Sequence, residues 1–545
     1  MTNYGDDLVF AERSGNVYYW TLDTINWSRA ETLEDKANSV TKLSTTATFA
    51  SGVTTIVVDD ATNFDTGMVL TGSGIPPDTF VTTAWDGSTS VTISNATTES
   101  HTVSAIPVDA SYAGRHVPTE TNLVIFSPVN DFLICMGATP YSPTDFNPKF
   151  DPLLVRWADQ GNPYEWVPAV TNQSGEQRLS NGSQIMAAVN TRQEVVILTD
   201  TAVYSMQYIG PPFVWGFNLI DQDISVASQI SVISVNNSVY WMGLDKFYVY
   251  NGRVQTLDCT LRQHVFSTLN RTQITQVMCG HNEAFSEVWW FYPGTDSLTN
   301  SLYVIYNYLE NVWSYGSLRR SSYAQQNVRA YPMLTFSVQN SYLNQAINSG
   351  DDTISLIDAS TYPNEGTITI GAEEITYTEK LGNILTGCIR GVNGTTAASH
   401  AQYDPVTFNV PNQVMFHEVG WDDGSVFPAL PINSFIETSD FDIGDGEQFA
   451  FVSRIIPDVK FLGSDEPNPS VTLTVYPHNY PGAAYGTGDA NSVSATVVLP
   501  VEQYTEQVYT RIRGRQIAFR VASSDLGVAW QMGAMRLDIR PDGRR

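Results

Sequence analysis

Three aspartates, Asp440, Asp442 and Asp445, lie in one short run of the sequence that also contains two glycines. Alternation along a strand would place Asp440 and Asp442 on one face, where two carboxylates suit a calcium ion or the acid pair of a glycosidase. The EF-hand spacing fails, because no glutamate follows at the required position of the loop. The run therefore predicts a solvated turn or, as the alternative, a weak cation site at these three aspartates.

A row of arginines, Arg511, Arg513 and Arg515, occupies alternate positions near the end of the chain. On a strand these guanidinium groups would line one face, and arginine is well suited to pair with carboxylates across interfaces. Acidic residues outnumber basic ones 56 to 28 in the whole chain. We therefore expect the row to contact a carboxylate of a neighbouring subunit or an adaptor protein, with an ordinary solvated face as the alternative.

No specific catalytic motif accompanies these groups. The sequence has no GxSxG elbow, no HExxH pair and no complete phosphate-binding loop. Its seven histidines are scattered, and His417 with Glu418 cannot share a metal on one strand, because adjacent residues of a strand point to opposite faces. We expect no enzymatic activity, no metal and no cofactor.

The composition favours strands and turns as the elements that carry these residues. Only 15% of the 545 residues are charged and 42% are apolar, so polarity comes mainly from Ser, Thr, Asn and Gln. The net charge of -28 repels phosphates and disfavours tight nucleic-acid binding by the whole chain. No apolar stretch approaches the roughly 18 residues of a membrane span, and no signal peptide is evident, so we expect synthesis in a cytoplasm.

Pairs of short aromatic strands joined by polar turns recur along the chain. Sheets of this kind, repeated about every 45 residues, are typical of β-propeller blades, and a sandwich with long loops is the alternative. The predicted strands are residues 8–10 with 17–20, 123–126 with 132–135, 195–198 with 203–206, 239–242 with 247–250, and 288–292 with 302–306 and 311–315.

Two segments interrupt this pattern with few aromatics and with short Val/Thr strands between glycine-rich turns. The fold expected is all-β: an irregular β-propeller core with two small inserted β-modules and a C-terminal β-sandwich-like domain. The predicted bounds are 1–43 for the first part of the propeller, 44–108 for module I, 109–342 for the main part of the propeller, 343–410 for module II and 411–545 for the sandwich.

Several segments resemble tail proteins of podovirus-type, short-tailed bacteriophages. Residues 67–76 and 390–397, in the two modules, are similar to small β-domains that recur in phage virion proteins. The segments that resemble the tail proteins are residues 156–166, 240–252, 439–446, 513–516 and 538–545.

The resemblance implies a virion protein, a tail nozzle subunit that forms a homo-oligomeric ring, by family habit a hexamer. It would sit below the portal and its adaptor, near tail fibre or tip proteins, retain the genome and then let double-stranded DNA pass without sequence-specific binding. We expect its lumen to be acidic or neutral, because phosphate contacts would slow a sliding polyanion. A receptor- or glycan-binding tail component and, more remotely, a glycan hydrolase are the alternatives.

Overall fold

Strands dominate the part of the chain that the structure describes. The described helices are short: α1 (Leu33–Val40), α2 (Arg262–Thr268) and the 3-10 turns η2 (Arg271–Gln276) and η3 (Glu283–Phe285). The chain divides into two compact units, Met1–Ser267 and Thr268–Arg545. The computed structural model describes residues 1–545 except 24–27, 41–42, 63, 65–67, 77–78, 84–86, 112–115, 143–144, 146–147, 171, 296, 325–330, 337–340, 360–361, 363, 409–412, 425–428, 444–445, 484, 486–493 and 545.

Four sheets of the first unit share one build, four strands hydrogen-bonded in sequence order. This antiparallel meander is the build of a propeller blade, and it confirms each strand pair predicted for this unit. The blades are β1 (Thr2–Tyr4), β2 (Asp7–Ala11), β3 (Val17–Trp20) and β4 (Glu31–Thr32); β10 (Thr121–Ser127), β11 (Phe132–Ala138), β12 (Asp151–Trp157) and β13 (Gly175–Arg178); β14 (Ile185–Asn190), β15 (Val195–Thr199), β16 (Ala202–Gly210) and β17 (Val214–Gln222); and β18 (Val232–Val235), β19 (Ser238–Met242), β20 (Phe247–Tyr250) and β21 (Val254–Leu257).

Neighbouring blades of this unit pack face to face, as the alternation along β15 shows. Val195 and Ile197 are buried in a core cluster with residues of the β10–β13 blade. Val196 and Leu198 point the other way, into a cluster with residues of the β18–β21 blade. Because successive strand residues face opposite sides of a sheet, an apolar run on a central strand fills two cores at once.

A tight turn between two strands shows how local sequence sets these hairpins. Asn236 and Asn237 connect β18 to β19, and their φ angles are 49° and 66°. A two-residue hairpin turn with positive φ at both positions matches the right-handed twist of the strands. Asparagine tolerates this region better than most residues, so the Asn-Asn pair fixes the register.

The second unit begins with a fifth meander of the same build, β22 (Met278–Asn282), β23 (Glu287–Pro293), β24 (Asn300–Asn307) and β25 (Val312–Ser317). Trp289 and Phe291 of β23 pack with Leu334 of a neighbouring small sheet. That sheet consists of β26 (Ser322–Ala324), β27 (Met333–Phe336) and β35 (Gln413–Phe416). The predicted domain bounds placed β35 in the C-terminal domain. Instead β35 pairs with β27, which precedes module II in the sequence. The chain therefore returns after module II to complete the sheet that the insertion interrupts.

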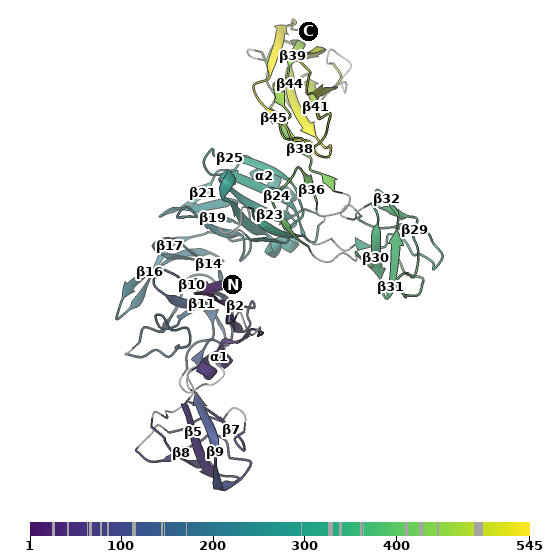
Figure 1. Cartoon of the computed structure of the whole chain (residues 1–545). Coiled ribbons are helices and arrows are strands. Elements are labelled where there is room, and N and C mark those ends of the chain that lie inside the picture. The colour runs from purple at the N-terminus through teal and green to yellow at the C-terminus, as the bar shows by residue number, and fades with distance from the viewer. Residues whose placement is uncertain are drawn as a thin grey trace. The chain divides into compact units, whose positions relative to one another are not determined.

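Module I is a five-stranded sheet with its own core (Figure 1). Phe49, Ile56, Leu70 and Val108 belong to a buried cluster formed only by residues of this module. The last strand runs three residues past the predicted end at 108. The strands are β5 (Leu43–Phe49), β6 (Thr55–Val58), β7 (Val69–Gly72), β8 (Ser90–Thr92) and β9 (His101–Ser111).

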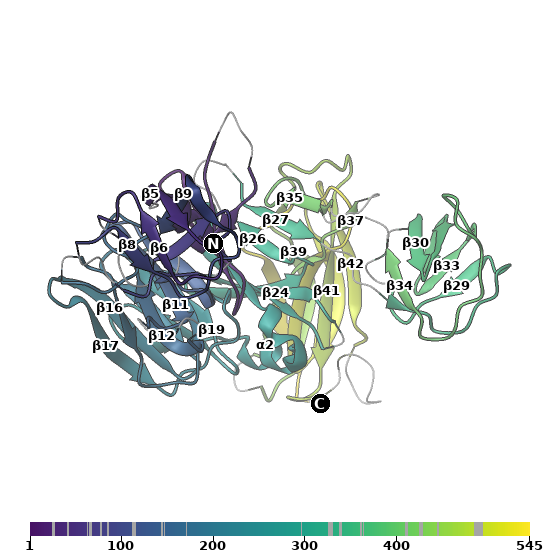
Figure 2. The same cartoon turned by 90° about the horizontal axis from the view of Figure 1, so that it is seen from below.

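Module II also has a core of its own, formed by two small sheets (Figure 2). A loop follows the last strand of the smaller sheet, across residues 388–395. Positive φ angles at Gly391, Asn393 and Gly394 explain why these residues leave the sheet. The strands are β28 (Ser341–Tyr342), β34 (Pro405–Phe408), β30 (Gly366–Ile370) and β31 (Glu373–Tyr377), and β29 (Thr353–Ser355), β33 (Ile384–Thr386) and β32 (Glu379–Leu381).

The buried carboxylate of Glu373 holds the loop of module II that runs from residue 390 to residue 400. Glu373 is 1% exposed and accepts hydrogen bonds from Nε and Nη2 of Arg390, both at 2.8 Å. His400 Nε2 lies 2.7 Å from the same carboxylate, and the backbone N–H groups of Gly391 and Ala398 also donate to it. A charge buried in this way is stable only because every oxygen has partners, so Glu373 fixes the loop from residue 390 to residue 400.

The C-terminal domain is a sandwich of two antiparallel sheets around one apolar core, as predicted. Strand β39 of this domain ends at Ile456, because the next residue, Pro457, has no N–H for the ladder. One sheet has β38 (Ser434–Glu437), β44 (Gln516–Ser523), β41 (Ser470–His478) and β42 (Val497–Glu502), and the other has β43 (Val508–Gly514), β39 (Ala450–Ile456) and β46 (Arg536–Pro541). Short ladders join β36 (Asp422–Asp423) to β37 (Leu430–Pro431) and β40 (Val459–Lys460) to β45 (Gln531–Met532).

The chain is thus all-β, with an irregular β-propeller core, two inserted β-modules and a C-terminal sandwich.

Candidate subunit interface on the C-terminal sandwich

The predicted arginine row lies on strand β43 and the turn that follows it. Thr510, Ile512 and Gly514 of β43 are buried, so the alternating residues Arg511 and Arg513 face outward. Arg515 lies just past the end of the strand. The predicted shared face is confirmed for Arg511 and Arg513, and Arg515 joins them through an aromatic contact.

Phe449 is the aromatic residue at this contact. The Arg513 guanidinium lies over its ring at 3.9 Å from the centroid, and that of Arg515 lies at 5.1 Å. A guanidinium stacked on an aromatic ring gains about 0.5–2 kcal/mol, depending on how far it is desolvated. Phe449 is 1% exposed, so the two arginines cover it from the solvent side.

Arg513 and Arg511 differ in how they are held. Arg513 forms an ion pair with Asp542 and donates a second hydrogen bond to the Asp542 carbonyl at 3.1 Å. Arg511 is exposed, and its side chain has no partner among the described residues. The carboxylate that pairs with Arg513 therefore belongs to the same chain, whereas no described residue pairs with the Arg511 guanidinium.

Further arginines extend this surface across the three-stranded sheet. Arg513 and Arg540 both pair in register with Phe451 on the central strand β39, and Arg454 pairs with Tyr509. Paired residues of a sheet share a face. We call this surface the arginine face; it consists of Tyr509, Arg511 and Arg513 on β43, Phe451 and Arg454 on β39, and Arg536 and Arg540 on β46.

Charge on the arginine face is only partly neutralised. Asp538 lies 3.9 Å from Arg454 and 3.8 Å from Arg540, so one carboxylate serves two guanidinium groups. Arg540 is 72% exposed, and Tyr509 is 71% exposed. Exposed arginines beside an exposed tyrosine are the composition typical of interface hot spots.

The predicted cation site at the aspartates is described in part. Asp440 accepts a hydrogen bond from the Tyr485 hydroxyl at 3.2 Å and lies 3.5 Å from His478 Nε2, while Asp442 lies 3.5 Å from the Gln516 amide. Asp445 lies outside the described residues. Within the described ranges, no three His, Cys, Asp or Glu residues gather in a way that could hold a metal ion.

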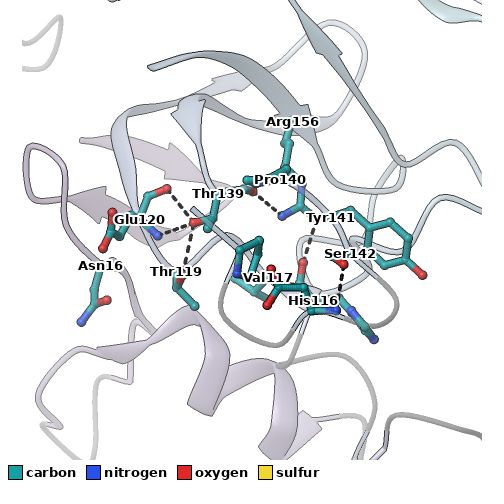
Figure 3. A pocket seen from close by; sticks show the side chains of 12 residues that line it. Asn16, His116, Val117, Thr119, Glu120, Thr139, Pro140, Tyr141, Ser142 and Arg156 are labelled. Carbon is teal, nitrogen blue, oxygen red and sulfur yellow. Dashed lines mark hydrogen bonds between the residues drawn. The ribbon is translucent and has the colours of Figure 1, made fainter. Parts of the chain in front are cut away.

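A polar pocket of about 240 Å³ lies beside Arg156 of β12 (Figure 3). Arg156 is 2% exposed and donates to the carbonyls of His116, Thr139 and Trp166, at 2.8, 2.8 and 3.2 Å. Burial lowers the pKa of this guanidinium to about 10, although Glu176 partly offsets the effect. Because its donors are used within the chain, Arg156 ties the segment after module I to its blade.

Sequence reasoning missed most of the arginine face. It found Arg511 and Arg513 because they alternate within one strand. Arg454 and Arg540 join them only through strand pairing between segments more than 50 residues apart, and no local signal in the sequence reports that pairing. Phe449 likewise carries no signal of its stacking role.

Comparisons with known proteins add no functional assignment. No protein-family model and no curated protein matches the chain. Matching solved structures include Hsv2 of Kluyveromyces lactis (11% identity, 62% of this chain and 73% of that chain covered, TM-score 0.23) and apo AztD from Citrobacter koseri (11% identity, 71% and 98% covered, TM-score 0.23). The N-terminal domain of Nup159 also matches (8% identity, 73% and 88% covered, TM-score 0.21). TM-scores this low carry no argument, and the blades are assigned from the strand pairing of this chain.

In the described part of the chain, no helix is both long and apolar enough to cross a membrane.

Proposed function

We propose that this chain is a structural subunit of a short bacteriophage tail, a nozzle protein that assembles into a ring through which the genome leaves. The observation that carries the proposal is the arginine face, an exposed basic and aromatic surface in a chain with a net charge of -28. The resemblance of the sequence to podovirus tail proteins supports the proposal.

The charge distribution favours contact between copies. Ten of the 28 basic residues but only 14 of the 56 acidic residues lie in positions 431–545. The remaining 430 residues therefore carry most of the excess negative charge, and a basic face at the end of one copy complements an acidic surface of the next. A contact between two different patches repeats around an axis and closes into a ring when the rotation allows.

The net negative charge of the chain also suits a conduit for DNA. Phosphate contacts strengthen as salt falls and would retard a long polyanion, so a subunit that places its arginines in protein contacts keeps them away from the genome. The proposed partners are further copies of this chain, an adaptor near the portal and tail fibre or tip proteins. We propose location in the virion tail after synthesis in the host cytoplasm.

Site-specific photo-crosslinking tests the proposal. A benzophenone amino acid would replace Tyr509 on the arginine face, and, as a matched control, Tyr403 of module II, which is 62% exposed. We expect irradiated tails to give chain-to-chain or chain-to-adaptor products from position 509 and none from position 403.

The outcome is read by mass spectrometry of the crosslinked peptides. Products that join position 509 to acidic segments of a second copy or to an adaptor support the interface. Equal yields from both positions, or no product from position 509 in intact tails, would contradict it.

A further inference from the structure

A hairpin projects from the β14–β17 blade of the first unit. The pairing of β16 with β15 ends at Met206, whereas its pairing with β17 continues to Gly210. The end of the hairpin therefore extends past the neighbouring strand. Its residues 209–213 include two large apolar side chains in contact with solvent, since Ile209 is 57% exposed and Phe213 is 75% exposed. We call residues 209–213 the apolar tip.

The apolar tip carries few groups that require water. Residues 201–220 contain no Asp, Glu, Lys, Arg or His. Gly210 pairs with Val214 across the hairpin, and the two prolines of the turn have no N–H to leave unpaired. The N–H of Trp215 donates to the Phe213 carbonyl at 2.7 Å. The turn thus presents few unpaired donors to a hydrocarbon phase, where each of them would be costly.

Other exposed apolar residues lie at the same end of the blades. The chain reverses at each turn of an antiparallel meander, so the first and third turns of a blade share one end. The first turn of the β10–β13 blade carries Val129, which is 72% exposed, and the third connection carries Val170, which is fully exposed. Tyr208, near the apolar tip, contacts both connections: its ring lies 5.7 Å from that of Phe132, and its hydroxyl donates to Gln173 at 2.9 Å. Apolar projections from two blades therefore gather at one end of the unit.

The charges near this end favour a particular kind of surface. Asp131 in the β10–β11 turn and Arg192 in the β14–β15 turn are both exposed, so the surroundings of the tip have no excess of positive charge. The net charge of -28 gives the chain no attraction to an anionic membrane. Insertion of apolar side chains between lipid headgroups, in contrast, depends mainly on the apolar area that is buried.

We propose that the apolar tip inserts into the headgroup region of a zwitterionic lipid bilayer. Phe213 and Ile209 supply the apolar area that enters, and Val129 and Val170 rest on the surface beside them. A protein socket surrounds an apolar residue with a polar rim, to which residues 201–220 offer no charged partner. A fluid bilayer requires none. The proposal does not depend on the proposed tail function.

Flotation of the full chain with phosphatidylcholine vesicles tests the proposal. We expect the wild-type protein to float with the vesicles and the double variant Ile209→Ser, Phe213→Ser to bind at least about tenfold more weakly. Both side chains are exposed, so the melting temperature should stay unchanged. Phe213→Leu keeps the tip apolar and should retain binding. Val103→Ser is the matched control, because Val103 is 99% exposed on β9 of module I.

Lipid charge and salt separate insertion from electrostatic adhesion. Binding should persist at high salt and should weaken when phosphatidylglycerol is added to the vesicles. No flotation of the wild-type protein with phosphatidylcholine, equal flotation of the double variant, or binding that needs phosphatidylglycerol and is lost at high salt would overturn the proposal. Impaired tail assembly of the double variant, without lipid binding by the wild type, would overturn it in favour of a protein socket.

Discussion

The blades and the inserted modules bury their apolar residues in different ways. Each core cluster of the first unit's propeller joins residues of two neighbouring blades. The clusters of the two modules contain residues of one module only. We therefore expect the effect of a core substitution to spread between blades and to stay local in the modules.

The largest expected effect is that of Trp241→Ala. Trp241 is fully buried in the cluster shared by the β14–β17 and β18–β21 blades, and truncation of a buried tryptophan costs about 3–5 kcal/mol. We expect hydrogen exchange measured by mass spectrometry to accelerate in both blades. Ile368→Ala in the core of module II is the matched control and should accelerate exchange in that module alone. Acceleration confined to the β18–β21 blade in Trp241→Ala would show that the blades unfold separately.

Glu373→Gln should destabilise module II by about 3 kcal/mol, because it leaves Arg390 buried without its carboxylate. Burial opposes ionisation of Glu373, but Arg390, His400 and the Ala398 N–H outweigh it and lower the pKa from 4.5 to about 2. The stabilisation is therefore complete above pH 4.5 and is lost as the pH falls from 4.5 towards 2.

Hydrogen exchange of module II across this pH range measures the effect. We expect protection of the wild-type module to fall between pH 4.5 and 2, and protection of the glutamine variant to be lower at pH 7 and flat over that window. Equal protection of the two proteins at pH 7 would mean that the carboxylate does not hold the loop.

On the arginine face we expect smaller effects, which differ between Arg513 and Arg511. Arg513→Ala removes an ion pair and the stacking on Phe449, and should destabilise the sandwich by about 1 kcal/mol. Arg511→Ala should leave the free energy of unfolding within about 0.5 kcal/mol of the wild type yet weaken tail assembly. Urea denaturation and the yield of assembled tails measure the two effects. Normal assembly of the Arg511 variant would remove this residue from the interface.

Much of the fold could be predicted from the alternation of apolar and polar residues and from turn residues, because both signals act within a few positions of the sequence. The strand pairs of the five meanders, the two modules and the sandwich were predicted in this way. The return of β35 to β27 and the loop around Glu373 were not, since they depend on contacts between segments more than 15 residues apart. For the same reason alternation revealed Arg511 and Arg513, but not Phe449.

The smallest expected effect is that of deleting module I. A deletion limited to residues 44–106 would leave the end of β9 without its partner β5, since Leu43 pairs with Ala110. Deletion of residues 43–111 with a short Gly/Ser bridge removes the whole sheet, and should change the free energy of unfolding of the blades by less than about 1 kcal/mol. Circular dichroism and thermal melting check this. Loss of folding would show that module I supplies core residues to the blades.

The most direct test of the proposed function is the position of this chain in averaged electron-microscopy images of intact particles. Our account predicts a closed ring of identical subunits on the tail axis, most simply six, below the portal and adaptor, with no density for the chain elsewhere. Peripheral spikes that carry the chain at the tail edge, with a different protein forming the axial ring, would contradict the account and favour an adhesin.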